Sequence, residues 1–139
     1  MKTGVEILEH TADMGFRVSA ESFEQLLAAA GEGLASIVMD CSEARPLETI
    51  EIAAQGEDRE ALMVNFLSEV LFVLDGRQLA IARIVVTASG PHGVSAALMC
   101  EPRDGQRHPP RHGVKGVTYH QLRVLPQPAE WIAEVYLDI

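Results

Sequence analysis

The sequence predicts an α+β fold: a single two-layer domain in which two amphipathic helices pack on a largely antiparallel sheet of about seven strands. Two stretches repeat apolar residues with the 3.6-residue period of a helix, and about seven short stretches have the alternation or the composition of strands. Short turns join most of these strands, which favours antiparallel pairing. The length of 139 residues is that of one ordinary domain, so we expect residues 1–139 to form a single domain.

The first two strands are expected on either side of the sequence HTADMG, residues His10 to Gly15. The preceding residues VEILE alternate apolar and polar side chains, and the following residues FRVSA place Phe16 and Val18 on one face. We interpret HTADMG as a turn, in which Asp13 is the polar residue and Gly15 the conformationally flexible one.

Two helices are predicted from apolar side chains at helical spacing. Residues 23–39 form the first, with Ser22 as its N-cap and Gln25 completing a capping-box pattern. A strand over residues 48–55 follows, and Asp58 then caps the second helix, which the sequence DGR ends. The apolar stripes consist of Phe23, Leu26, Leu27, Ala30, Leu34, Ile37 and Val38 in the first helix, and Leu62, Phe66, Leu67, Val70, Leu71 and Leu74 in the second.

The remainder of the chain is predicted to be strands and loops. Residues 79–89 and 94–100, separated by the sequence GPHG, have the pattern of an antiparallel hairpin. Residues 101–113 carry mixed charge, two adjacent prolines and no apolar pattern, so we expect an exposed loop. Strands over residues 117–125 and 131–139 complete the fold.

The charge distribution bears on the kind of partner. The net charge is −9, with −11 in residues 1–76 and +2 in residues 77–139. An acidic molecule repels phosphate backbones, which disfavours direct nucleic-acid binding as the main activity; a basic protein partner or a metal ion fits the sign better.

No apolar run is long enough to span a bilayer, the first residues lack the apolar region of a secretory signal, and Cys41 and Cys100 form no CxxC pair. We therefore expect a cytoplasmic protein with reduced cysteines and no membrane association.

Asp13 is the first candidate for a functional residue. As a structural residue, its side chain would hydrogen-bond the backbone two residues further on; as a functional one, it would supply a carboxylate to a metal site. His10, three residues earlier, is a candidate to support that carboxylate or bind the metal, or is a structural histidine.

The C-terminal pair Asp138 and Ile139 is the second candidate. A strand that runs to the last residue would place the Asp138 side chain beside the main-chain carboxylate of Ile139. Adjacent carboxylates repel each other, and a hard cation such as Ca²⁺, Mg²⁺ or Mn²⁺ relieves this repulsion through oxygen coordination. Zinc is less favoured, because the chain has no Cys/His set at ligand spacing. If the fold also brings Asp13 to this end, three oxygen donors converge.

The sequence VKGVTYHQLRV holds two further candidates. Lys115 precedes the predicted strand between Gly113 and Gly116, where its ammonium group would reach a phosphate or an acidic partner, or would simply be solvated. His120 shares a face with Leu122 in the strand pattern, which is more typical of a structural histidine than of a binding residue.

No motif of a stand-alone enzyme is present. The sequence has no nucleophile elbow, no Gly-rich phosphate loop and no recognisable pair of catalytic carboxylates. Two alternatives to a binding protein stay open at this point: a metal-dependent small-molecule enzyme with Asp13 as base and Lys115 as anion binder, and a general chaperone-like protein in which Asp13 is structural.

Three segments, taken together, resemble the archease family: LEHTADMGFRV (8–18), VKGVTYHQLRV (114–124) and AEVYLDI (133–139). The sequence RDGQRH (103–108) resembles the family's Asp…Arg-His loop, and the order and spacing match from end to end. Departures are small: Met14 and Phe16 replace smaller aliphatic residues, and Gly116 stands where Ala is common.

The resemblance implies an SHS2-like fold and a non-enzymatic activator of an RtcB-type RNA ligase. Such a protein promotes guanylylation of the ligase by GTP, so that the ligase turns over repeatedly in tRNA splicing and RNA repair. The resemblance also implies a metal site formed by Asp13, Asp138 and Ile139, with Lys115 in contact with the ligase or its nucleotide.

Overall fold

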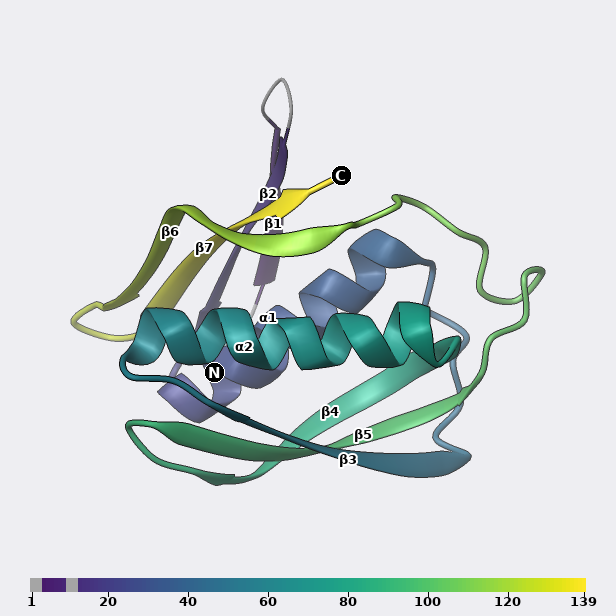
Figure 1. Ribbon diagram of the computed structural model, residues 1–139, viewed down its shortest axis with the longest axis horizontal. Coiled ribbons are helices and arrows are strands. Elements are labelled where there is room, and N and C mark those ends of the chain that lie inside the picture. Colours follow the sequence, from purple (N-terminus) through teal and green to yellow (C-terminus); the bar gives the residue numbers. More distant parts are fainter. Residues whose placement is uncertain (1–3, 10–12) are drawn as a thin grey trace.

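Two antiparallel sheets enclose two helices in the computed structural model (Figure 1). The structure describes residues 4–9 and 13–139, and for residues 8, 9 and 13 it describes the backbone only. The elements, in chain order, are β1 (Gly4–Glu9), β2 (Asp13–Ala20), α1 (Phe23–Val38), β3 (Glu48–Gln55), α2 (Arg59–Leu71), the π-helical turn η1 (Phe72–Gly76), β4 (Leu79–Ser89), β5 (Gly93–Pro102), β6 (Gly116–Pro126) and β7 (Trp131–Asp138).

Both helices begin at the predicted caps. The Ser22 hydroxyl accepts a hydrogen bond from the Gln25 amide at 3.1 Å, and a carboxylate oxygen of Asp58 accepts one from the Ala61 amide at 2.8 Å. Each cap satisfies an amide group that the first turn of a helix leaves unpaired. The predicted starts of α1 and α2 are confirmed, α1 ends one residue before the predicted Met39, and η1 extends α2 to the predicted stop at Gly76.

Residues 4–9 and 13–139 contain seven strands, which are divided between two sheets. One sheet has the order β1-β2-β7-β6 and the other the order β3-β5-β4, and all neighbouring strands are antiparallel. The predicted α+β class, with two helices and about seven antiparallel strands, is confirmed, but the strands do not form the one sheet that we expected. Since hydrophobic periodicity identifies strands and says nothing of their long-range partners, the sequence pattern does not contain this division.

The helices lie between the sheets and pack against both of them. Helix α1 contacts β2 and β4, and α2 contacts β3 and β6. The apolar stripes of both helices are buried there, together with the inward-facing side chains of the strands. Cys100 is a free thiol within this core and Cys41 is one packed against it, and burial raises the pKa of both. Neither helix of the described chain is long and apolar enough to cross a membrane.

Candidate functional site

Strands β2 and β7 bring the first and the last part of the chain together. Their register places Asp13 directly opposite Asp138 at the end of the sheet where β2 begins and β7 ends (Figure 1). Residues directly opposite each other in an antiparallel pair lie on the same face, with Cα atoms about 4.5–5.5 Å apart. The backbone therefore brings these two predicted site positions side by side.

A third strand supplies Lys115 at the same place. Gly116, the first residue of β6, stands opposite Asp138 on the other side of β7. The Lys115 amide donates a hydrogen bond of 2.6 Å to the Asp138 carbonyl. The side chains of Lys115 and Asp138 are exposed, and Ile139 is 42% exposed. Because the amide contact uses the carbonyl of Asp138, its side-chain carboxylate stays available to a ligand.

The donor set suits a hard cation if Asp13 completes it. Asp138 and Ile139 offer carboxylate and main-chain oxygen atoms, the ligands that Ca²⁺, Mg²⁺ and Mn²⁺ prefer. The residues whose side chains the structure describes contain no group of three His, Cys, Asp or Glu that could hold a metal. The predicted centre thus depends on Asp13, of which only the backbone is described. His10 lies outside the described residues.

Gly15 belongs to strand β2 and makes room for a buried tyrosine. The structure places it opposite Tyr136 within the strand, and not in the turn that we expected from the HTADMG pattern. A Cβ atom at Gly15 would lie 2.6 Å from Cε2 of the Tyr136 ring. Tyr136 is only 6% exposed, although it lies on the same face of β7 as the exposed Asp138. Glycine is needed here because the ring packs directly on the strand backbone.

His120 stands in an irregular part of β6, next to that tyrosine. The pairing of β6 with β7 passes from Thr118 opposite Tyr136 to Arg123 opposite Glu134. Residues 119–122 therefore stand opposite Val135 alone, which makes a large bulge. The His120 ring meets the Tyr136 ring edge-on at 6.3 Å between centroids, and the His120 side chain is exposed. His120 is thus a surface residue, and the strand alternation that paired it with Leu122 does not hold across the bulge.

A row of alternating charges crosses the outer face of the four-stranded sheet, four residues from Asp138 along β7. Glu6, Arg17, Glu134 and Arg123 are successive register partners on β1, β2, β7 and β6. Arg17 donates from Nε to Glu134 at 2.8 Å and lies 3.8 Å from Glu6. The hydrogen bond to Glu134 raises the pKa of the Arg17 guanidinium group. This row aligns the strands that carry Asp13 and Asp138.

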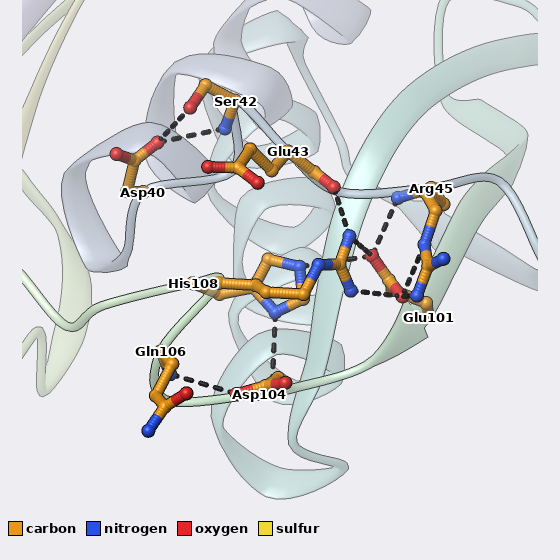
Figure 2. Close-up of polar contacts among 9 residues, drawn as sticks. Asp40, Ser42, Glu43, Arg45, Glu101, Asp104, Gln106 and His108 are labelled. Carbon is orange, nitrogen blue, oxygen red and sulfur yellow. Dashed lines mark hydrogen bonds and ion pairs between the residues drawn. The ribbon is translucent and has the colours of Figure 1, made fainter.

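A second polar cluster surrounds Glu101, which the sequence analysis did not select (Figure 2). Glu101 is 2% exposed, and both nitrogens of the Arg107 guanidinium fork donate to its carboxylate at 2.9 Å. The Arg45 amide donates to it at 2.8 Å, and Nε2 of His108 lies 3.1 Å from it. These contacts, the Arg107 hydrogen bonds first, hold the pKa of Glu101 far below its usual value.

Most of residues 101–113 form the exposed loop that we predicted, but Glu101 belongs to β5 and, like His108, is buried. His108 is fully buried, and its Nδ1 accepts a hydrogen bond from the Asp104 amide at 2.9 Å. Beyond it, the Arg111 and His112 amides donate to the last carbonyls of α1. The sequence analysis missed these two buried residues because a paired and fully hydrogen-bonded charge can be buried without an apolar pattern in the sequence.

A surface hollow lined by Gln55, Gly56, Glu57, His92 and Gly93 lies at the turn between β3 and α2. None of the predicted site residues lines it. The predicted site lies instead at the exposed end of a sheet, in a position that another macromolecule can reach.

Comparison with known proteins covers almost the whole chain. The sequence model of the Archease protein family (MTH1598/TM1083) matches residues 6–139. Protein archease of Methanopyrus kandleri is 34% identical over 137 residues, which cover 96% of this chain and 98% of that protein. Protein archease of Thermococcus gammatolerans is 33% identical over 139 residues, with 96% and 97% covered.

Solved structures show the same fold. The solution structure of protein 1598 from Methanobacterium thermoautotrophicum superimposes with a TM-score of 0.80 at 26% identity and covers 98% of this chain and 99% of that one. A Thermotoga maritima crystal structure, described as an archease and possible chaperone, gives a TM-score of 0.63 at 21% identity, with 95% and 94% covered. At 21% identity this second likeness concerns the fold alone. The chain described here belongs to the archease family.

Proposed function

We propose that this chain is a non-catalytic, divalent-metal-binding protein cofactor of an RtcB-type RNA ligase. It acts in the cytoplasm, promotes guanylylation of the ligase by GTP, and so permits repeated turnover in tRNA splicing and RNA repair. Membership of the archease family supports this role. The observation that carries the proposal is the register of β2 on β7, which sets Asp13 opposite Asp138.

Asp13, Asp138 and the main-chain oxygens of Ile139 are the residues that would hold the cation. A divalent cation held there supplies positive charge that offsets the negative charge of nucleotide phosphates. The two aspartates come from different strands, and the backbone pairing of β2 with β7, which the Arg17–Glu134 ion pair also joins, holds those strands together. The protein contributes positioning, and the covalent chemistry takes place on the ligase.

Lys115 fits the same role as a contact residue. The backbone amide of Lys115 donates a hydrogen bond to the Asp138 carbonyl. Its ammonium group is exposed and has no ion pair with the side chains that the structure describes. A lysine held at its backbone and free at its tip can approach a phosphate or an acidic residue of the ligase next to the proposed cation. His10 and His120 are secondary candidates for contact with the ligase or its nucleotide, because each lies in one of the segments that resemble the family.

The direct test is guanylylation of the cognate ligase with labelled GTP. Substitution Asp138→Ala or Asp13→Ala should abolish stimulation by this chain, and Lys115→Ala should weaken it. Glu51→Gln, an exposed carboxylate change on the other sheet, is the matched control and should stimulate like the wild type. Full stimulation by both aspartate variants would overturn the proposal.

Assays on the purified chain without the ligase test the two alternative functions, a small-molecule enzyme and a general chaperone. An enzyme acting on small molecules would turn over phosphoesters or nucleotides without the ligase. A general chaperone would suppress aggregation of unrelated unfolding proteins, and would do so equally with and without divalent cations. The proposal predicts neither activity in the wild-type chain.

A further inference from the structure

A cationic stretch runs through the second half of this acidic chain. Residues 105–129 contain no Asp or Glu, but four Lys or Arg residues and three histidines. Two of the four cations are used within the fold: Arg107 binds Glu101, and Arg111 contacts Asp40 and the Ser36 carbonyl. Lys115 and Arg123 are exposed, and among the described side chains neither has an ion pair within 4 Å. Both cations are therefore exposed along β6, although Arg123 stands opposite Glu134 and Lys115 lies next to Asp138 of the neighbouring strand.

The bulge of β6 lies between these two free cations. Tyr119 is 59% exposed there, beside the exposed His120. The Thr118 hydroxyl holds the bulge, because it donates to the Tyr136 carbonyl at 3.2 Å and accepts from the His120 amide at 3.1 Å. The bulge is thus built by specific hydrogen bonds, and it presents an aromatic ring to solvent.

Gln121 in the bulge has a φ of 52°, which non-glycine residues rarely adopt. The one other such residue among those described, Gln78, follows the end of η1, where left-handed residues commonly terminate a helix. Gln121 instead takes this conformation within the bulge of an edge strand. A strained residue in an edge-strand bulge often marks a position at which a side chain is turned toward a ligand.

Protection of the sheet edge does not account for this arrangement. Strand β6 is the last strand of its sheet, and bulges and lysines commonly prevent such edges from pairing with other chains. That purpose needs no exposed tyrosine, which adds apolar surface at the place to be protected. The ring and the two cations together are instead the components of a surface that binds single-stranded nucleic acid.

We propose that Lys115, Tyr119, His120 and Arg123, here named the β6 edge, bind a short single-stranded RNA segment. The Tyr119 ring stacks on a base, and Lys115 and Arg123 contact the phosphates on either side. The net charge of −9 restricts the ligand to a few nucleotides, since a longer backbone would meet the acidic remainder of the molecule. This inference rests on the proposed function: an activator of RNA joining would touch the RNA end as well as the ligase.

The experiment measures binding of the full chain to a fluorescein-labelled single-stranded RNA of about eight nucleotides, by anisotropy at low salt, without ligase or GTP. Tyr119→Ala should weaken binding roughly tenfold or more, and Tyr119→Phe should retain it. Arg123→Ala should reduce the slope of log affinity against log salt by about 0.7. Matched controls are Phe72→Ala, another exposed aromatic residue, and Arg83→Ala on β4; both should bind like the wild type.

Three results would overturn the inference: no RNA binding by the wild-type chain, equal losses in the control variants, or tighter binding of a polyglutamate peptide that Tyr119→Ala leaves unchanged. The last result would assign the β6 edge to an acidic protein partner. The RNA-binding experiment contains no ligase, so a negative result in it does not bear on the guanylylation test. A negative guanylylation test, in turn, does not decide whether the chain binds RNA.

Discussion

Gly15 and Tyr136 show at the scale of single residues why the HTADMG motif contains its glycine. The Tyr136 ring occupies the space in which any side chain at residue 15 would lie. Tyr136 thereby lies next to the register pair Asp13 and Asp138, and the His120 ring meets its ring edge-on. The glycine of this motif therefore serves packing beside the candidate site.

Substitution Gly15→Ala should lower the free energy of unfolding by about 1–3 kcal/mol, because the added methyl group displaces the buried ring. Denaturant unfolding measures this. The control is Gly116→Ala, where an added Cβ has no neighbour within 4 Å, and its expected effect stays within about 0.5 kcal/mol. A Gly15→Ala chain as stable as the wild type would show that the ring moves aside at no cost.

Glu101 makes the stability of the protein depend on pH in the acid range. Its pKa is lower in the folded chain than in the unfolded one, so its contribution is present above the unfolded pKa of about 4.3 and is lost as the pH falls through the folded value. Removal of its charge leaves Arg107 and Arg45 without their partner.

Glu101→Gln should therefore be less stable than the wild type near neutral pH. The difference between the two should stay constant down to about pH 5 and then shrink, because the Glu101 carboxylate of the unfolded wild type gains a proton before that of the folded chain. Thermal unfolding of both chains from neutral pH to about pH 3 tests this. The Glu43→Gln chain is the control, since the Glu43 contact to Arg107 uses its backbone carbonyl. A stability difference between wild type and Glu101→Gln that grows toward low pH would contradict a lowered pKa of Glu101 in the folded chain.

At the scale of elements, the bulge in β6 depends on one hydroxyl group. Thr118→Val keeps the shape of the side chain but removes both hydrogen bonds, at an expected cost of about 1 kcal/mol. Hydrogen exchange at the His120 amide should become faster. Thr49→Val, at an exposed position of β3, should change neither stability nor exchange at His120. Unchanged protection in the Thr118 variant would mean that the bulge is held by other contacts.

Elements that depend on local signals were predictable from the sequence. The N-caps Ser22 and Asp58 and the apolar periodicity placed both helices, and strands β3 and β4 have the bounds that alternation indicated. The division into two sheets, the β6 bulge and the buried Glu101 depend on partners far away in the sequence. No periodicity encodes these contacts, so sequence analysis missed them.

At the scale of the whole molecule, the fold brings together residues more than a hundred positions apart. Strands β2 and β7 are neighbours, so the sequence motif around Asp13 and the one that ends at Ile139 meet at one end of a sheet. The candidate residues themselves were found by residue type and by family resemblance. Their proximity could not be derived from spacing, because strand pairing across 125 residues is a property of the complete fold.

The charge of the molecule agrees with a cofactor that works on another protein. A net charge of −9 raises the local concentration of cations at the exposed Asp138 carboxylate and favours approach to a basic surface. Both effects should weaken with salt, because the site is exposed and its field is screened over about 8–10 Å at physiological ionic strength.

The most direct test of the account is a calorimetric titration of the wild-type chain, Asp13→Asn, Asp138→Asn and the double variant with Mn²⁺ or Ca²⁺. We expect one bound cation in the wild type and an affinity about tenfold or more weaker in each single variant. The double variant should lose less than the sum of the two, since both carboxylates serve one ion. Wild-type affinity in both single variants, or no binding by the wild type, would contradict the claim that these two strand ends hold a cation together.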